Sequence, residues 1–190
     1  MSSILLTAPA LEPLSLAEAK AFLRVETSDD DDVISALISG SRIHIEAQTR
    51  RALITQSWRI IRDAWPASGL LPLMPVPLAS LDAVRIYQAD GSTQSLDTSA
   101  FVLDKAAAPA VLAFAAPPLA PGRTVAGIEV DITVGYGAAA SNVPEALRQA
   151  IRLLVAHWYE NRAIAAVGQQ TTVLPETVAA LIAPYRVFSL

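Results

Sequence analysis

The sequence predicts an α+β fold, in which N- and C-terminal helices form a helical bundle and an antiparallel β module is inserted between them. Apolar residues recur at helical spacing near both ends of the chain, whereas the middle contains short β-branched or alternating segments separated by turn residues. The expected parts are an N-terminal helical part (1–56), a β module (57–137), a C-terminal helical part that completes the bundle (138–184) and a C-terminal tail (185–190).

Two helices are expected in the N-terminal part. Ser15 followed three residues later by Glu18 is a capping-box pattern, which predicts a short helix through Phe22. The four aspartates 29–32 begin a longer helix that ends near Arg50, because acidic and basic side chains then match the two ends of the helix dipole. The aspartates lack the alternating ligands and central glycine of a calcium loop, so we expect a solvated helix start rather than a cation site.

The β module is expected to be antiparallel. Three prolines confine residues 71–78 to an edge or a connection, and Asp90-Gly91 is a typical hairpin turn. In the segment 128–134 apolar and polar residues alternate, and the glycines at 135 and 137 then allow the chain to turn. Strands are therefore expected within 58–65, 83–88, 101–103, 111–114 and 128–134.

The C-terminal part predicts an amphipathic docking helix followed by a shorter helix. Pro144 and Glu145 suit the first turn of the docking helix, and Pro175 and Pro184 bracket the second helix. The apolar stripe of the docking helix, which we expect to close the subunit's own helical core, consists of Leu147, Ile151, Leu154 and Trp158.

Composition restricts the class of protein. Hydrophobic residues make up 53% of the 190 residues, which indicates a real core and surface intended for burial against other subunits. A net charge of -4 argues against a protein that grips nucleic acid by neutralising phosphates. The chain has no cysteine, which excludes disulfides, thiolate metal sites and cysteine nucleophiles. Residues 1–14 are a poor secretory signal and prolines interrupt the longest apolar run, residues 106–121, so we expect a cytoplasmic product with no membrane-spanning helix.

No candidate catalytic constellation stands out. His44 and His157 are the only histidines and neither has a second histidine at metal-ligand spacing, while phosphate-loop and serine-nucleophile motifs are missing. We therefore expect both histidines to serve packing or interfaces, with no catalytic residue, metal or cofactor. The alternative is a small hydrolase or ligand-binding α+β domain that uses His157.

Several motifs occur along the chain in a characteristic order. They are SLAEAKAFLR at 15–24, Trp58, the proline-rich 71–78, Asp90-Gly91, VGYG at 134–137, AHWYENR at 156–162, Leu174-Pro175 and Pro184-Tyr185-Arg186. Together they resemble the head-tail connector (adaptor) proteins of tailed bacteriophages and of the related gene transfer agents. The resemblance covers nearly the whole chain.

This resemblance implies a structural particle protein without enzymatic activity. It implies a dodecameric ring beneath the portal protein that extends the DNA channel and links the head to a neck or tail component, either a stopper or a tail terminator. DNA would pass through the lumen without sequence-specific binding, and no membrane would be involved. The implied location is the head-tail junction of a virion or gene transfer agent particle, with assembly in the bacterial cytoplasm.

Two sets of residues are expected to contact partners. A ring subunit needs two different complementary faces, and the polar side of the docking helix is the expected subunit interface: Arg148, Arg152, His157, Tyr159 and Arg162. The resemblance assigns the C-terminal tail to portal contact, through Tyr185, Arg186, Val187, Phe188 and Leu190. We expect the tail to be disordered in the free protein and ordered on binding.

Overall fold

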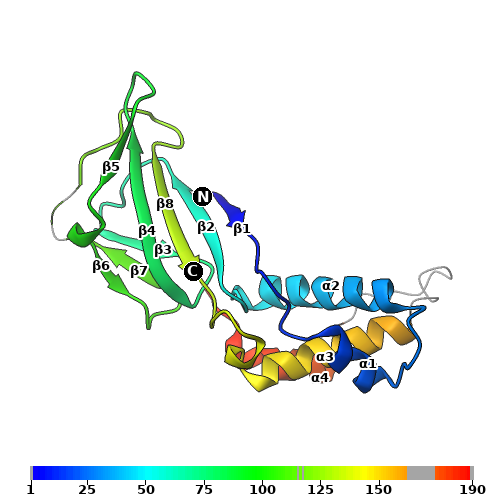
Figure 1. The fold of residues 1–190 in the computed structure, drawn as a ribbon. Coiled ribbons are helices and arrows are strands. Elements are labelled where there is room, and N and C mark those ends of the chain that lie inside the picture. The colour runs from blue at the N-terminus through cyan, green and yellow to red at the C-terminus, as the bar shows by residue number, and fades with distance from the viewer. Residues whose placement is uncertain (1, 115, 117, 162–173, 189–190) are drawn as a thin grey trace, which may run out of the picture. The chain divides into compact units, whose positions relative to one another are not determined.

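The computed structural model describes residues 2–114, 116, 118–161 and 174–188, and these form an α+β fold with four α-helices and two antiparallel sheets (Figure 1). The predicted fold class is confirmed at that level. The chain divides into two compact units. The sheet unit consists of Met1–Ala10, Thr55–Tyr136 and Val187–Leu190, and the helical unit consists of Leu11–Ile54 and Gly137–Arg186.

The sheet unit contains a five-stranded and a three-stranded antiparallel sheet. The five-stranded sheet has the order β1 (Ser2–Thr7), β2 (Gln56–Arg62), β8 (Ile128–Val134), β4 (Leu78–Tyr87) and β5 (Thr93–Leu96). The three-stranded sheet has the order β3 (Leu70–Leu73), β7 (Ala110–Ala113) and β6 (Val102–Asp104). The central strand β8 buries Ile128, Val130, Ile132 and Val134 completely, as their alternation predicts.

Turn chemistry explains how the strands are connected. Gly91 has a φ of 85°, which lets the chain reverse between β4 and β5, as the Asp-Gly pair predicts. Pro72 lies in β3, at the edge of the three-stranded sheet, where a residue without an N–H is tolerated. A short 3-10 helix, Thr98–Ala100, precedes β6.

The expected assignment of residues 1–56 to the helical part is wrong at its start. Residues 2–7 form β1, which pairs with β2, and residues 1–10 belong to the sheet unit. The first strand is exposed along its whole length, so it has neither the alternation of a half-buried strand nor a helical period. Its formation depends on backbone pairing with a strand that begins about fifty residues later, which local sequence does not report.

A charge cluster joins three neighbouring strands of the five-stranded sheet. The Asp131 carboxylate on β8 accepts hydrogen bonds from Arg59 Nε on β2 at 2.7 Å and from Arg85 Nη1 on β4 at 2.6 Å. Glu129 lies 3.2 Å from Arg59 Nη1. The hydrogen bonds from Arg59, with those from Arg85, hold the pKa of Asp131 below its ordinary value although the residue is only 8% exposed.

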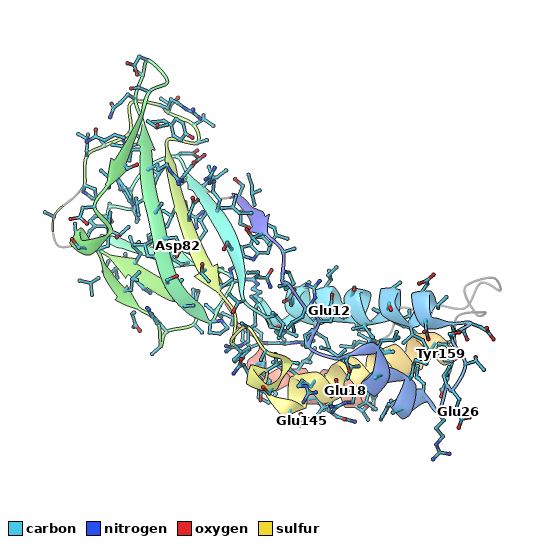
Figure 2. All side chains as sticks on the ribbon, viewed as in Figure 1. Glu12, Glu18, Glu26, Asp82, Glu145 and Tyr159 are labelled. Atoms are coloured by element: carbon cyan, nitrogen blue, oxygen red, sulfur yellow. The ribbon has the colours of Figure 1, made fainter. Side chains whose placement is uncertain are left out.

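Asp131→Asn is expected to lower the free energy of unfolding by about 2 kcal/mol, because it removes charge-assisted hydrogen bonds from two arginines. A lowered folded-state pKa contributes stability above the unfolded pKa, so the difference from wild type should shrink as the pH falls below about 4. Urea unfolding of both proteins at a series of pH values measures this difference in the free energy of unfolding. Asp82→Asn is the control, since the exposed Asp82 carboxylate (Figure 2) accepts from the Ser80 and Thr133 hydroxyls. Equal losses in both variants at neutral pH would contradict the prediction.

The helical unit consists of α1 (Leu16–Leu23), α2 (Asp31–Thr49), α3 (Glu145–Glu160) and α4 (Glu176–Ile182). Figure 1 shows α2 and α3 side by side, and α3 contacts both α2 and α4. The core of the helical unit includes Ile34, Ile38 and Ile45 from α2, Leu147, Ile151 and Leu154 from α3, and Val178 and Ile182 from α4. The predicted apolar stripe of α3 is therefore buried except for Trp158, which is partly exposed.

The helix starts agree with the sequence patterns. Ser15 and Glu18 form both halves of the capping box of α1. The acidic run begins α2 as expected, and one of its aspartates, Asp31, also pairs with Lys20 Nζ at 2.5 Å. No helix in the described part of the chain is both long and apolar enough to cross a membrane.

The glycine-rich turn after β8 has the backbone that the sequence predicts. Gly135 has a φ of 121° and donates its N–H to the Pro77 carbonyl within the sheet unit. Gly137 has a φ of 155° and begins the helical unit, where the Asn142 side chain lies against it. A 3-10 helix, Ala140–Asn142, then leads into α3.

Candidate partner-binding surfaces

Arg148 on α3 is engaged within its own helical unit. Its Nη2 donates to Glu18 at 2.6 Å, its Nη1 to Glu145 at 2.9 Å, and its Nε to the Pro13 carbonyl at 3.1 Å. Its side chain is only 15% exposed. Hydrogen bonds from the capping residue Ser15, with the charge of Arg148, lower the pKa of Glu18. The structure therefore gives this predicted interface residue a role in joining the start of α1 to α3.

Arg152 lies one turn further along α3 and also has partners in its own unit. Its Nη1 donates to Glu145, and its Nη2 lies 3.9 Å from Glu18. The hydrogen bond from Arg152 and the nearby Arg148 charge lower the pKa of Glu145. Figure 2 shows the labelled Glu18 and Glu145 on the same helical unit. The partners of the two arginines include a residue about 130 positions away, which helical periodicity alone does not reveal.

Tyr159, near the end of α3, is bound to the start of α2. Its hydroxyl donates to the Asp30 carboxylate at 2.5 Å. Asp30 is the residue that precedes the first turn of α2, so the contact fixes one end of α3 against the acidic run. The role of Tyr159 at a subunit interface stays a prediction, and Arg162 lies outside the described residues.

The two histidines lie near the end of α3. His157 Nδ1 is 3.3 Å from the side-chain nitrogen of Asn161, a contact that does not orient a catalytic base in the way a carboxylate does. His44 on α2 meets the Trp158 ring edge-on, with the ring centroids 5.9 Å apart. In the described part of the chain, no group of three or more His, Cys, Asp or Glu side chains could hold a metal ion.

The C-terminal segment is more ordered than its sequence predicts. A short 3-10 helix, Ala183–Tyr185, ends α4, and the Tyr185 carbonyl accepts from Arg51 Nε at 2.7 Å. Arg186 Nη2 donates a hydrogen bond to Gln48 Oε1 at 3.3 Å. Val187 is 6% exposed, whereas Phe188 is 82% exposed.

The expectation of a wholly disordered tail is therefore wrong for residues 185–187, because tertiary contacts with distant residues hold them. Of the expected portal-contact residues, Phe188 is the one that the described structure presents almost fully to solvent. Leu190 lies outside the described residues.

A second apolar face of α2 escaped the sequence reasoning. Exposed residues recur on one side of the helix, and they are Val33, Ala36, Ile43 and Ala47. We call them the α2 stripe. Ile43 is 57% exposed and Val33 is 41% exposed. The sequence contains the pattern that reveals this face, because α2 is apolar on two sides. A helix that packs against its own core on one side needs apolar residues on that side alone.

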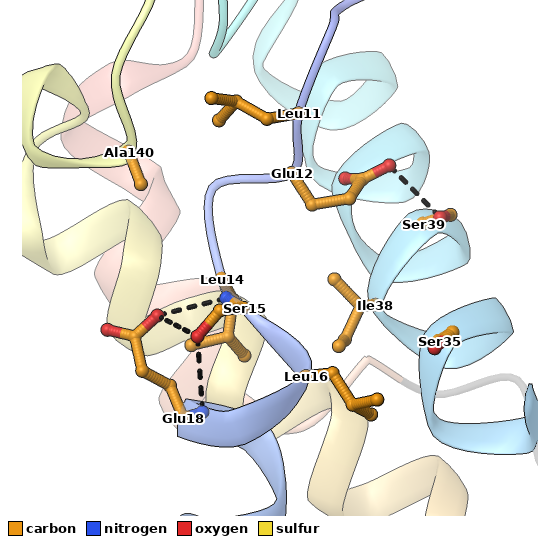
Figure 3. A pocket seen from close by; sticks show the side chains of 10 residues that line it. All are labelled: Leu11, Glu12, Leu14, Ser15, Leu16, Glu18, Ser35, Ile38, Ser39 and Ala140. Carbon is orange, nitrogen blue, oxygen red and sulfur yellow. Dashed lines mark hydrogen bonds between the residues drawn. The ribbon is translucent and has the colours of Figure 1, made fainter. Parts of the chain in front are cut away.

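A pocket of about 380 Å³ lies in the helical unit between the segment that leads into α1 and the side of α2 (Figure 3). Leu11, Leu14 and Ile38 contribute apolar walls. Both carboxylates in its lining are paired: Glu12 accepts from Ser39 Oγ at 3.0 Å, and Glu18 is bound by Ser15. The pocket is open and mainly apolar, and its two carboxylates are engaged in hydrogen bonds of the fold.

The fold has close relatives among solved structures. A chain of the neck of an empty GTA particle, computed with C6 symmetry, is similar with a TM-score of 0.83 and 28% identity over 100% of this chain and 97% of that chain. A chain of the virion of a native gene transfer agent particle gives a TM-score of 0.83 at 27% identity, with the same coverage. A chain of the neck of a native GTA particle, computed with C12 symmetry, gives a TM-score of 0.76 at 30% identity, again with 100% and 97% coverage. No curated protein matches the chain.

These similarities define the class of protein, which is a structural protein of the head-tail junction. A family model described as "Head completion protein" matches residues 12–188. The chain belongs to the head completion protein family. The connector resemblance carried by the sequence motifs is thereby confirmed.

Proposed function

We propose that this protein is a head-tail connector that forms a ring beneath the portal protein, extends the DNA channel and links the head to the next neck or tail component. The observation that carries the proposal is the match over the whole chain to a neck component, at a TM-score of 0.83. The C12 symmetry applied to one similar neck supports a ring of twelve subunits.

The proposed role is structural and non-catalytic. In the proposed arrangement, α1 to α4 form the helical bundle that builds the ring, and the C-terminal segment reaches the portal. A net charge of -4 suits a channel wall, because a mildly acidic protein does not hold passing DNA through phosphate contacts. No contact of His157 in the described part of the chain favours the alternative of a hydrolase or ligand-binding domain.

Mixing the purified protein with its cognate portal protein, followed by electron microscopy, tests the proposal. We expect a ring of connector subunits coaxial with the portal. A mixture in which the portal rings stay bare at micromolar concentrations of both proteins would contradict it. A monomeric free protein is compatible with the proposal, since the portal can act as the template for the ring.

A further inference from the structure

The helical unit has two outward faces that its own core leaves exposed. The first is the α2 stripe, which lies opposite the buried residues Ile34, Ile38 and Ile45, because each residue advances about 100° around a helix. None of the stripe residues carries a charge. The second is the outer face of α4 and the turn that follows it, with exposed Thr177, Ala180, Ala183 and Pro184.

The two faces have matching chemistry. Both consist of small or apolar residues, and Glu176 is the charged exposed residue at the start of α4. Alanines allow two helices to approach closely, and Ile43, which is 57% exposed, supplies a large apolar side chain to the α2 stripe. The two faces belong to different helices, α2 and α4, which both contact α3.

The polar side of α3 is a poorer choice for a subunit interface. Arg148 and Arg152 are bound to acidic residues of their own unit, and Tyr159 is bound to Asp30. Using them in an interface would require breaking those contacts or burying the charges further, which costs free energy. Burying the uncharged α2 stripe in an interface has no such free-energy cost.

We propose that the α2 stripe of one subunit docks against the outer face of α4 in the next copy of this chain. The inference rests on the proposed function, which supplies the ring of copies. A ring needs a heterologous interface made of two different faces of one chain, and the α2 stripe and α4 face are such a pair. The interface residues are Val33, Ala36, Ile43 and Ala47 on one side, and Ala180 and Ala183 on the other.

Cross-linking on the portal tests this pairing. The chain has no cysteine, so introduced thiols are the only reactive ones in the connector. A chain carrying both Ile43→Cys and Ala180→Cys should give a ladder of covalent oligomers when a flexible bis-maleimide is added to the ring. A mixture of the two single variants should stop at dimers, since each link needs one thiol from each chain. Ser35→Cys with Ala180→Cys is the control, because exposed Ser35 lies about 115° around the helix from the mean direction of the α2 stripe.

Two cross-linking results would overturn the proposal. One is an assembled ring in which the double variant gives no ladder. Cysteines at Ala36 and at Ala47, each paired with Ala180→Cys, allow for a different helix register and must give no ladder either. The other is a strong dimer from Ile43→Cys alone, which would mean that the α2 stripes of two copies face one another.

A charge substitution separates this inference from the proposed function. Ile43→Asp should reduce ring formation on the portal at least tenfold, whereas Ser35→Asp should assemble like wild type. Ile43 is more than half exposed, so thermal melting should remain close to that of wild type. If wild type forms no ring on the portal, the proposed function fails and the inference fails with it. If wild type and Ile43→Asp form rings equally well, only the α2–α4 pairing is wrong.

Discussion

Replacing Phe188 by alanine is expected to weaken binding to the portal protein by about thirtyfold, the effect of losing an aromatic hot-spot residue worth about 2 kcal/mol. Phe188 is 82% exposed, so its ring makes little contribution to the fold. The residues before it are held by the bond from Arg51 to the Tyr185 carbonyl and by the burial of Val187. An aromatic side chain on an ordered segment loses less conformational freedom on binding, which favours affinity.

Binding measured with immobilised portal rings, together with thermal melting, checks this expectation. Phe22→Ala is a matched control, because Phe22 is also exposed, at 42%, but lies on α1. Both variants should melt like wild type, and only Phe188→Ala should lose affinity. Unchanged portal affinity for Phe188→Ala would remove the C-terminal segment from the portal contact. Truncation before Tyr185 is a less specific test, since it also deletes the carbonyl that Arg51 binds.

Replacing Gly137 by alanine is expected to lower the free energy of unfolding by about 2 kcal/mol. Gly137 has a φ of 155°, which side-chain-bearing residues rarely adopt. An added Cβ would lie 2.4 Å from Asn142 Oδ1, the atom that accepts the Ala139 N–H at 3.0 Å. The substitution therefore strains the backbone and disrupts the turn that leads into α3.

Urea unfolding of a double-mutant cycle separates the two causes. Asn142→Ala removes the two nearest overlapping atoms, Oδ1 and Cγ, and leaves the Asn142 Cβ, which lies 2.8 Å from the added carbon. The loss in Gly137→Ala/Asn142→Ala should therefore be smaller than the sum of the single losses by about 1 kcal/mol. Gly91→Ala is the control for strain alone, because Gly91 has a φ of 85° and no atom within 4 Å of an added Cβ. Additive losses in the cycle would show that Asn142 moves aside freely and that the overlap is unimportant.

Local patterns predicted most of the elements because their causes lie within a few residues. The capping box at Ser15, the Asp90-Gly91 turn and the alternation in β8 each depend on neighbours in sequence, and each is confirmed. The strand β1 was missed, since only pairing with β2 makes it a strand. The two compact units also follow pairing and packing rather than sequence order, because residues 1–10 and Val187 lie in the sheet unit.

The candidate surfaces depended more heavily on the tertiary structure. Arg148, Arg152 and Tyr159 lie on the polar side of α3, and helical spacing favoured them as interface residues. Glu18, which binds Arg148, and Asp30, which binds Tyr159, lie about 130 residues earlier in the chain, and Arg152 binds Glu145 of its own helix, so folding engages these side chains within the subunit. Conversely, the sequence of α2 is apolar on two sides, and packing decided which of them is buried and which stays exposed as the α2 stripe.

The sequence by itself determined the family, the α+β class and most of the helices and strands, because these follow from residue order and local periodicity. The tertiary structure decided which polar side chains are already paired, that the residues before Phe188 are anchored and which apolar face of α2 stays exposed. Those outcomes depend on contacts between residues far apart in the chain, and periodicity describes one element at a time.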